Sequence, residues 1–417
     1  MKIALINTFY PPYNFGGDGV YVRRFAHALA RRGCDVHVLH DAETFKALAA
    51  KPLGDLTPLE EPPGVTVRSL HSPLGVGASL ITHQTGRPLA HRAALREFFA
   101  EEFDVTHFHN VSSLGGPGIL TEGSGVKLYT AHEHWLVCPT HILWRYDREL
   151  CDKRECVRCQ IAYRRPPQLW RQTGFLAKQA AAVDAFIALS RSSADNHKRF
   201  GFPFEMRVLP TFLPDETPFI LSAAVAAKPY ALFVGRLEKL KGLQDVIPVF
   251  REQTEIDLLI AGEGDYGREL RALAGEATSI RFLGRKAPAD LASLYAGAAA
   301  VLLPSACYEV FPLVALEAFR SGAPIVARNL GPFPEIIEAS RAGALFDTPE
   351  AAFAETLRLA RNPALRAELS ARARGAVERC WSETVAMRAY FNLIAETADA
   401  KRRKDIASKA LELANFG

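Results

Sequence analysis

The chain has 417 residues, of which 48% are hydrophobic and 23% are charged, and this composition excludes a disordered or fibrous protein. With about 100–200 residues per domain, the length predicts two domains. The 50 basic and 46 acidic residues leave a net charge of only +4, which gives no general reason to expect a nucleic-acid partner.

The first forty residues predict a strand, a glycine-bearing loop, a helix and a second strand. KIALIN at 2–7 has the apolar composition of a buried strand, and CDVHVLH at 34–40 has it again. The loop PPYNFGGDG and the helical pattern VYVRRFAHALARRG lie between them. This βαβ order predicts a parallel, doubly wound sheet.

Gly16 and Gly17 lie in the loop that precedes this helix. A glycine has no side chain, so the backbone can approach a ligand closely, and a helix amino terminus favours an anion. The alternative interpretation is an ordinary turn between a strand and a helix. We assign no role to Asp18, which follows the two glycines.

Further apolar strands are predicted at 104–110, 126–134 and 185–190. Two of them carry histidines at alternate positions, namely His107 and His109 in the first and His132 and His134 in the second. Alternate residues share a face, so each pair is predicted to point to one side of its strand. A histidine at a strand end is often a structural residue, and the pattern alone does not identify an active site.

Four of the seven cysteines are clustered, in the pattern C-x12-C-x4-C-x2-C formed by Cys138, Cys151, Cys156 and Cys159. The C-x2-C pair has the usual chelate spacing, and four thiolates would close a tetrahedral, structural zinc site. An iron–sulfur cluster is a second possibility. Disulfides or free thiols are the alternative without a metal.

The odd number of cysteines and the short apolar start of the chain, which is far from a signal-peptide core, indicate a reducing cytosol. No apolar run approaches the roughly 18 residues that a spanning helix needs. The charge run Lys401–Lys404 could touch anionic lipid at the inner membrane face, but a solvated helix face is the alternative.

The segment MRVLPTFLPDETPF at 206–219 holds three prolines and is the predicted domain boundary. A second alternation of strands and amphipathic helices follows, with strands at 230–235, 256–262, 280–284, 300–304 and 323–328. The predicted fold is therefore α/β, with two Rossmann-like doubly wound parallel sheets. The predicted domains are 1–210, 211–378 and a final helical part, 379–417, that crosses back to the first.

The loop GRLEKLKG at 235–242 follows a strand and carries Arg236 and Lys241 between Gly235 and a second glycine. Ligands collect at the carboxyl ends of parallel strands, and two cations there suit a diphosphate. The pattern is not the G-x-x-x-x-G-K-[ST] phosphate loop, which argues against an ATPase.

Two carboxylates, Glu309 and Glu317, are separated by seven residues. Pro312 fits a first helical turn, so we expect Glu309 in the loop and Glu317 within the helix. The amides of Leu313 and Val314 would then be free at the helix amino terminus, where a phosphate can bind. Isolated glutamates are usually exposed charges, and the surrounding pattern has to decide between the two interpretations.

The ordered series GRLEKLKG, IAGEG (260–264), IRFLGR (280–285) and E-x7-E followed by SGAPIVA resembles the retaining glycosyltransferases of family 4, which have the GT-B architecture. The resemblance implies that Arg236 and Lys241 hold a diphosphate, that Glu309 contacts the donor hexose and that Glu317 binds the ribose. The remaining residues that it places at the donor are Gly16, Gly17, Gly235, Gly262, Gly264, Phe311, Leu313 and Val314. His132 matches the family's active-site histidine, and its catalytic partners would be Glu309, Arg236 and Lys241.

One part of the pattern departs from the commonest form of the family. A small residue and Phe-Gly are frequent after the first glutamate, whereas Val310, Phe311 and Pro312 stand here. The change affects which backbone amides can reach the donor, so the identity of the sugar stays open.

The expected reaction is transfer of a hexose from a nucleotide diphosphate-sugar to a hydroxyl of a glycan, a lipid-linked saccharide or a small molecule, with retention of configuration. The chain contains no Asp-x-Asp, which fits transfer without a catalytic metal. The alternatives are a GT-B epimerase or phosphorylase, and a non-catalytic nucleotide-sugar or zinc module. A dinucleotide oxidoreductase is disfavoured because no G-x-G-x-x-G follows the first strand.

Overall fold

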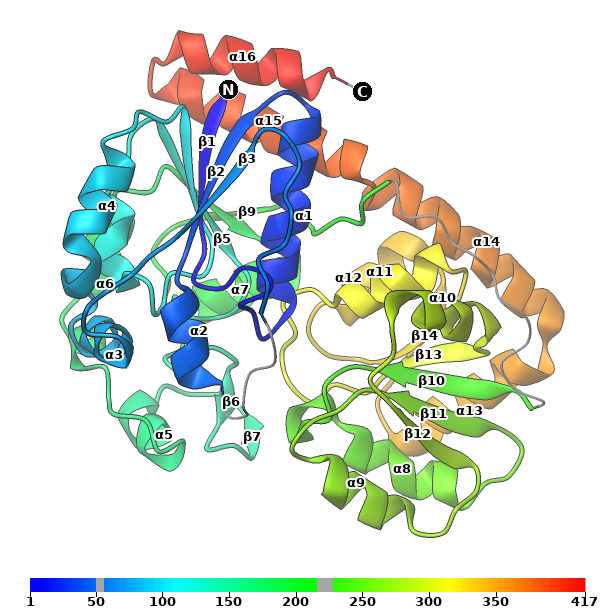
Figure 1. The fold of residues 1–417 in the computed structure, drawn as a ribbon. Helices are drawn as coiled ribbons and strands as arrows, with labels where there is room; N and C mark the ends of the chain where they lie inside the picture. The colour runs from blue at the N-terminus through cyan, green and yellow to red at the C-terminus, as the bar shows by residue number, and fades with distance from the viewer. Residues whose placement is uncertain (50–55, 216–227, 417) are drawn as a thin grey trace. The chain divides into compact units, whose positions relative to one another are not determined.

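The computed structural model describes residues 1–49, 56–215 and 228–416 (Figure 1). The chain divides into two compact units, one formed by Met1–Thr211 with Ala386–Gly417 and the other by Phe212–Val385. The boundary after Thr211 falls inside the proline-containing segment 206–219, of which residues 216–219 lie outside the described part of the chain.

The first unit contains a seven-stranded parallel sheet in the order β3-β2-β1-β4-β5-β8-β9. Its strands are β1 (Lys2–Ile6), β2 (Asp35–His40), β3 (Val65–Ser69), β4 (Val105–Phe108), β5 (Val126–Ala131), β8 (Ala185–Ala188) and β9 (Met206–Val208). A separate hairpin pairs β6 (Trp144–Arg145) with β7 (Glu149–Leu150). Strand β1 lies between β2 and β4, and Ile3 is in register with Val36 on one side and Val105 on the other.

The helices of this unit follow the strands along the chain. They are α1 (Gly17–Arg31), α2 (Ala42–Leu48), α3 (Val76–Thr85), α4 (Arg92–Phe99), α5 (Cys156–Ala162), α6 (Phe175–Ala180) and α7 (Arg191–Arg199), with short 3-10 turns η1 (Leu89–His91), η2 (Gly116–Thr121) and η3 (Leu169–Gln172). Helix α1 buries Tyr21, Val22, Phe25 and Leu29 at helical spacing, which gives it one apolar face toward the sheet.

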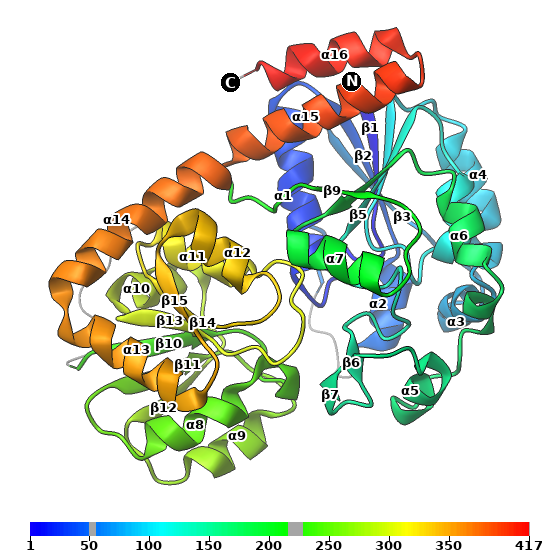
Figure 2. The same cartoon turned by 180° about the vertical axis from the view of Figure 1, so that it is seen from behind.

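The last helices complete the first unit. Helix α15 (Glu383–Ala400) continues into this unit from Ala386 on, and α16 (Lys404–Ala414) follows it at the amino ends of the strands (Figures 1 and 2). Tyr390 packs edge-on against Phe25 of α1, with ring centroids 4.8 Å apart. Lys401 pairs with Asp184 at 2.7 Å, and Lys409 pairs with Asp104 at 3.3 Å.

The second unit contains a six-stranded parallel sheet in the order β12-β11-β10-β13-β14-β15. Its strands are β10 (Tyr230–Val234), β11 (Asp257–Ala261), β12 (Ile280–Gly284), β13 (Ala300–Leu303), β14 (Ile325–Arg328) and β15 (Gly343–Phe346). Both faces of the sheet are buried. Ala231 and Phe233 of β10 enter one apolar core, and Tyr230 and Leu232 enter the other, as alternation along a strand requires.

Helices cover both faces of this second sheet (Figure 2). One set is α8 (Leu243–Arg251), α9 (Gly267–Ala274) and α13 (Pro349–Arg361). The other set is α10 (Pro288–Gly297), α11 (Leu313–Arg320), α12 (Phe333–Ser340) and α14 (Pro363–Cys380). The predicted doubly wound α/β fold with two parallel sheets is confirmed.

The structure differs from the sequence-based expectations at several boundaries. Helix α1 begins at Gly17, three residues before the predicted helical pattern. Strand β5 ends at Ala131, so His132 and His134 lie beyond it and the predicted alternation does not apply to them. No described helix is both long and apolar enough to cross a membrane.

Candidate active site

In the second unit, the side chains of two loops meet at the point where the strand order reverses. β10 is followed in the chain by its neighbour β11, but its other neighbour is β13, and ligands of open parallel sheets bind at such switch points. Lys241, in the turn η4 (Lys239–Lys241) after β10, places Nζ 2.6 Å from Oε1 of Glu309, in the loop after β13. Ser305 donates to the same oxygen at 2.7 Å. The structure therefore brings together Lys241 and Glu309, and adds Ser305, which sequence reasoning missed.

The charges of this cluster keep Lys241 and Glu309 ionised. Burial opposes the ionisation of Glu309, but the Lys241 ammonium, the Ser305 hydroxyl and the Arg236 charge outweigh it, and the pKa of the carboxyl is lowered. Burial likewise opposes the charge of Lys241, but Glu309 raises the pKa of the ammonium. Arg236 is more exposed, at 61%, and pairs with Glu238 at 2.5 Å. The cluster thus presents an exposed cation next to a mostly buried ion pair.

Glycines at the ends of β10 and β11 let their loops approach each other closely. A Cβ on Gly262 would lie 1.8 Å from the carbonyl oxygen of Gly235, and one on Gly264 would lie 2.4 Å from that of Leu237. Gly242, with φ of 76°, would meet the carbonyl oxygen of Pro304 at 1.9 Å. These glycines are required by the packing of the loops, whatever they do for a ligand.

A pocket of about 320 Å³ opens at these glycines. It is lined by Leu237, Gly262, Glu263, Gly264, Gly267, Arg268 and Arg271. The two arginines come from α9 and were not predicted, because a basic residue on a helix has the same sequence pattern when it is only solvated. The pocket adjoins two of the glycines that the family resemblance assigns to the nucleotide.

Helix α11 begins at Leu313, so Pro312 is its N-cap and lies just before the first helical turn in which it was predicted. Glu317 lies within the helix and accepts a hydrogen bond from the Tyr295 hydroxyl of α10 at 3.1 Å. Val314 and Phe311 pack against the apolar core, and the Phe311 ring lies 6.3 Å from that of Trp381. Phe311 therefore has a packing role in addition to any contact with a ligand.

The first unit has its own switch point, between β1 and β4. The loops that follow these strands are tied together, because Asn110 donates its backbone N–H to the Asn7 side chain at 2.8 Å and Thr8 donates its hydroxyl to the Asn110 carbonyl at 2.8 Å. Asn110 also donates its side-chain amide to Asp18 at 3.2 Å. Burial, helped by the charge of Glu133, raises the pKa of Asp18 to about 6.

The glycine loop of this unit contains one glycine that packing requires and one that it does not. At Gly19 a Cβ would meet Asn14 at 2.9 Å, so a side chain cannot fit. At Gly16, the N-cap of α1, the nearest atom would be an Asp18 oxygen at 3.7 Å, and its φ of −147° is open to any residue. Because Gly16 has no side chain, there is room for a ligand at Gly17, the first residue of α1.

The histidines lie close together behind this loop. His107 and His109 share a face, with ring centroids 4.1 Å apart. His109 Nδ1 lies 2.9 Å from Nε2 of His132, and the ring of Tyr21 lies 4.9 Å from that of His132. His134 instead stacks on His197, at 5.2 Å. His132 and His134 thus have different surroundings, because β5 ends at Ala131, before both of them.

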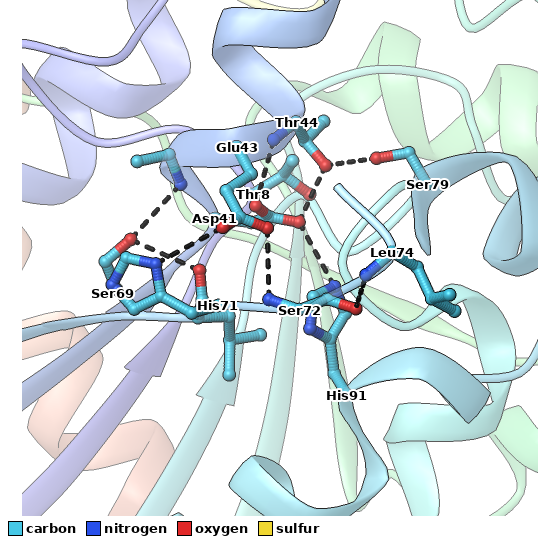
Figure 3. A network of polar contacts seen from close by, with 12 residues as sticks. Thr8, Asp41, Glu43, Thr44, Ser69, His71, Ser72, Leu74, Ser79 and His91 are labelled. Atoms are coloured by element: carbon cyan, nitrogen blue, oxygen red, sulfur yellow. Dashed lines mark hydrogen bonds and ion pairs between the residues drawn. The ribbon is translucent and has the colours of Figure 1, made fainter. Parts of the chain in front are cut away.

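A network of polar contacts fixes the loops after β2 and β3 of the first unit (Figure 3). Asp41 caps α2 through the Thr44 amide, at 2.9 Å, and its Oδ2 lies 3.4 Å from Nε2 of the buried His91. Burial opposes the ionisation of Asp41, but the bonds from His91 and Thr44 lower its pKa overall. Glu43 accepts from the Ser72 amide at 3.0 Å. These contacts tie the loops after β2 and β3 to each other.

The structure does not support the predicted metal site at the cysteine cluster. Among the described residues, which include all four cysteines, no group of three or more His, Cys, Asp or Glu side chains is arranged to hold a metal ion. Burial and the neighbouring thiols raise the pKa of Cys151 to about 12, so the four cysteines share one neighbourhood. The Cys138 thiol lies 3.3 Å from the Thr140 hydroxyl, and the Cys151 thiol donates to the Lys153 carbonyl at 3.3 Å. The zinc and iron–sulfur predictions are not supported.

Some cations of the charge run Lys401–Lys404 bind to other residues of the first unit. Lys401 donates to the Gly125 carbonyl at 3.0 Å and pairs with Asp184, while Arg403 pairs with Asp405 at 3.1 Å. Two of its four cations therefore have partners in the protein itself, which favours a structural role over contact with lipid.

Comparisons with known proteins agree with this architecture. A model described as Glycosyltransferase Family 4 matches residues 15–217, and one described as Glycosyl transferases group 1 matches residues 222–376. The chain is similar in structure to sucrose-phosphate synthase from Thermosynechococcus elongatus, with a TM-score of 0.70, 20% identity and coverage of 98% of this chain and 99% of that one. It is also similar to HepE of Anabaena in complex with UDP-glucose, with a TM-score of 0.65, 17% identity and coverage of 96% and 100%.

Two curated relatives show how far the sequence similarity extends. D-inositol 3-phosphate glycosyltransferase of Xylanimonas cellulosilytica is 28% identical, over 92% of this chain and 94% of the relative. Glycogen synthase of Thermus thermophilus is 39% identical over 140 residues, and the match spans 32% of this chain and only 32% of that protein. The fold and the two matching models define a glycosyltransferase of the GT-B architecture. The chain belongs to glycosyltransferase family 4, a family of retaining enzymes.

Proposed function

We propose that this protein transfers a hexose from a nucleotide diphosphate-sugar to an acceptor hydroxyl with retention of configuration. The bond between the anomeric carbon and the diphosphate oxygen breaks, and a bond from that carbon to the acceptor oxygen forms on the same face. The acceptor proton passes to an oxygen of the leaving phosphate, and the nucleoside diphosphate departs. The main barrier is the negative charge that gathers on the diphosphate as the first bond breaks.

The observation that carries this proposal is the Lys241–Glu309 ion pair at the switch point of the second unit, with Arg236 beside it. Lys241 and Arg236 would stabilise the charge of the leaving diphosphate, together with the Leu313 and Val314 amides at the start of α11. Glu309, which is ionised and held by two donors, would orient the hexose and is not a covalent nucleophile. Glu317, positioned by Tyr295, would accept hydrogen bonds from the ribose.

The first unit would supply the remaining groups. We assign a contact with the donor sugar to His132 and close approach to the donor phosphate to the backbone of Gly16 and Gly17. Gly235, Gly262, Gly264 and Phe311 keep their assignment to the donor, and the pocket beside Gly262 and Gly264 supports a place for the nucleotide there. Because the cations and amides of the chain supply positive charge, we expect transfer to proceed without a catalytic metal, and activity should survive EDTA.

The acceptor is a glycan, a lipid-linked saccharide or a small molecule, and the reaction belongs in the cytoplasm or at the inner face of the membrane. The named relatives act on chemically different acceptors, so the acceptor class has to come from a screen. UDP-glucose, which HepE of Anabaena binds in its crystal structure, is the first donor to test.

The test combines donor binding with product analysis. UDP-, GDP- and ADP-hexoses are ranked by calorimetry, and the best donor is incubated with a panel of acceptors. Lys241→Met and Arg236→Gln should each weaken binding of the nucleoside diphosphate by about 10–100-fold, since each removes a charge-assisted contact. NMR of the product should show the anomeric configuration of the donor.

Arg358→Gln is the matched control, because it removes an exposed cation of the same unit that pairs with Glu355 on α13. It should bind the donor as tightly as the wild type. If Lys241→Met and Arg236→Gln also bind as tightly, the proposed diphosphate site is wrong. Epimerised sugar in the absence of acceptor, or consumption of orthophosphate, would identify an epimerase or a phosphorylase instead.

A further inference from the structure

Three histidines lie in a row, with His132 in contact with His109 and His109 in contact with His107. His109 Nδ1 lies 2.9 Å from His132 Nε2, and the His107 ring lies 4.1 Å from the His109 ring. His107 is held on both sides, because its Nε2 lies 2.8 Å from the Thr130 hydroxyl and its Nδ1 lies 3.1 Å from the Tyr390 hydroxyl. All of these residues belong to the first unit.

The three imidazoles are neutral at physiological pH. Burial lowers the pKa of His107 and of His132 to about 3. Burial and the two neighbouring histidines lower the pKa of His109 well below its ordinary value. Each neutral ring carries one proton, so a single hydrogen lies between His109 Nδ1 and His132 Nε2, and only one of the two residues can be the donor.

The surroundings of His109 select the donor. Its other nitrogen, Nε2, is buried and has no hydrogen-bond partner in the described part of the chain. If His132 donated, the proton of His109 would sit on that Nε2, and a buried donor without an acceptor costs about 1–3 kcal/mol. If His109 donates from Nδ1, its Nε2 carries no proton, and buried N–H groups without partners are the rarer defect in proteins. The hydrogen bond at one ring nitrogen fixes the state of the other.

We propose that His109 is a positioning residue that donates from Nδ1 to His132 and thereby holds His132 as the Nδ1–H tautomer. The catalytic part of this inference rests on the proposed function, whereas the tautomer of His132 does not depend on it. His132 is partly exposed, and its Nδ1 lies on the ring edge away from the bond to His109. It therefore presents a hydrogen-bond donor to an oxygen of the bound sugar, and it is not a general base. Thr130 and Tyr390 hold the ring of His107, and the ring of His109 lies against it.

The direct test is the tautomer itself, measured on the full chain by two-dimensional NMR with 15N-labelled histidine at pH 7. The His132 resonances are assigned by comparison with His132→Gln. The proposal expects a protonated Nδ1 and an unprotonated Nε2 on His132, and the same pattern on His109. A protonated Nε2 on His132 overturns it.

Two substitutions of His109 test its part in the reaction. His109→Phe keeps the ring but removes the donor, so kcat should fall about 10–100-fold while the KM for the donor sugar changes by less than about threefold, and the His132 resonances should shift toward a mixture of tautomers. His109→Asn places an amide N–H near the position of Nδ1 and should restore most of kcat and the Nδ1–H tautomer. Unchanged kcat and unchanged resonances in His109→Phe would overturn the proposal.

His134→Phe is the matched control, because it removes another buried histidine of the same segment that stacks on His197 and not on His132. It should leave the His132 tautomer and kcat as in the wild type. If the wild type transfers no sugar from any donor, the proposed function fails, whereas the tautomer measurement still decides the inference. Should His109→Phe not fold, the wild-type spectrum and His109→Asn decide it.

Discussion

Asp18 is a carboxyl group in an unfavourable environment at the start of α1. It accepts a hydrogen bond from Asn110, but burial and the nearby charge of Glu133 raise its pKa from 3.8 to about 6. The folded protein therefore holds the proton more tightly than the unfolded chain does. Its contribution to stability falls as the pH rises from about 4 to 6 and stays low above that range. Unfavourable charges of this kind are retained at functional sites more often than elsewhere.

Asp18→Asn should therefore stabilise the protein at pH 7.5 but not at pH 4. The amide can still accept the bond from Asn110 and has no charge to bury, so we expect a gain of about 1–2 kcal/mol at the higher pH. Thermal unfolding midpoints at the two pH values measure the effect. Glu97→Gln, an exposed acid on α4, should show no such pH-dependent gain. A lower midpoint for Asp18→Asn than for the wild type at pH 7.5 would mean that the carboxylate is stabilising.

The chemistry of the paired residues could be predicted from their types, but their contacts could not. Lys241 and Glu309 are 68 positions apart, and only the adjacency of β10 and β13 brings them to 2.6 Å. Ser305 and Tyr295 hold Glu309 and Glu317, yet a serine in a loop and a tyrosine on a helix carry no signal of such a role. His109 shows the same limit, because its bond to His132 depends on the pairing of β4 with β5.

At the scale of elements, the strands that sequence reasoning missed lie mainly at the edges of the two sheets. β3 and β9 are the edges of the first sheet, and β15 is an edge of the second. An edge strand has one neighbour and is short or half exposed, as in VTVRS at 65–69, so it lacks the continuous apolar run of a central strand. Central strands such as β10 and β13 are buried on both faces and were predicted to within a residue.

The junction between the loops after β10 and β11 depends on the absence of side chains. Gly262→Ala would place a methyl group 1.8 Å from the Gly235 carbonyl oxygen, so the two loops must separate. We expect a loss of about 1–3 kcal/mol in the second unit and loss of nucleotide binding. Hydrogen exchange of β10 and β11 together with calorimetry measures both effects.

Gly77→Ala is the control for this substitution, because Gly77 lies in helix α3 and an added Cβ would meet only Leu74, at 3.8 Å. Alanine favours a helix over glycine, so this variant should be unchanged or more stable by up to about 1 kcal/mol. Normal exchange and normal nucleotide binding in Gly262→Ala would show that the loops have more freedom than the structure indicates.

At the scale of the whole molecule, the last helices belong to a unit that begins more than three hundred residues earlier. Tyr390 packs on Phe25 and bonds to His107, and Phe391 and Ile394 are also fully buried. Burial of each large apolar side chain contributes about 1.5–3 kcal/mol, so this segment is a large part of the stability of the first unit.

A chain that ends at Val385 should therefore lose the first unit and keep the second. We expect β4 and β5 to lose hydrogen-exchange protection by more than tenfold, while β10 and β13 retain theirs. A chain that ends at Ala400 keeps Tyr390 but lacks α16, and it should show a smaller loss confined to the first unit. Equal protection of β4 and β5 in the full chain and in the chain that ends at Val385 would contradict this division.

The class of fold, the two successive βαβ halves, and the residue types that suit a diphosphate and a sugar could be predicted without coordinates, because apolar period and loop chemistry are local properties of the chain. The comparisons confirm the family, whereas the roles of the individual residues stay predictions. The folded structure was needed to show which of these residues meet, that the four cysteines form no metal group among the described residues, and that His109 contacts His132. Contacts between distant segments depend on strand order and packing, and the spacing of residues along the chain predicts neither.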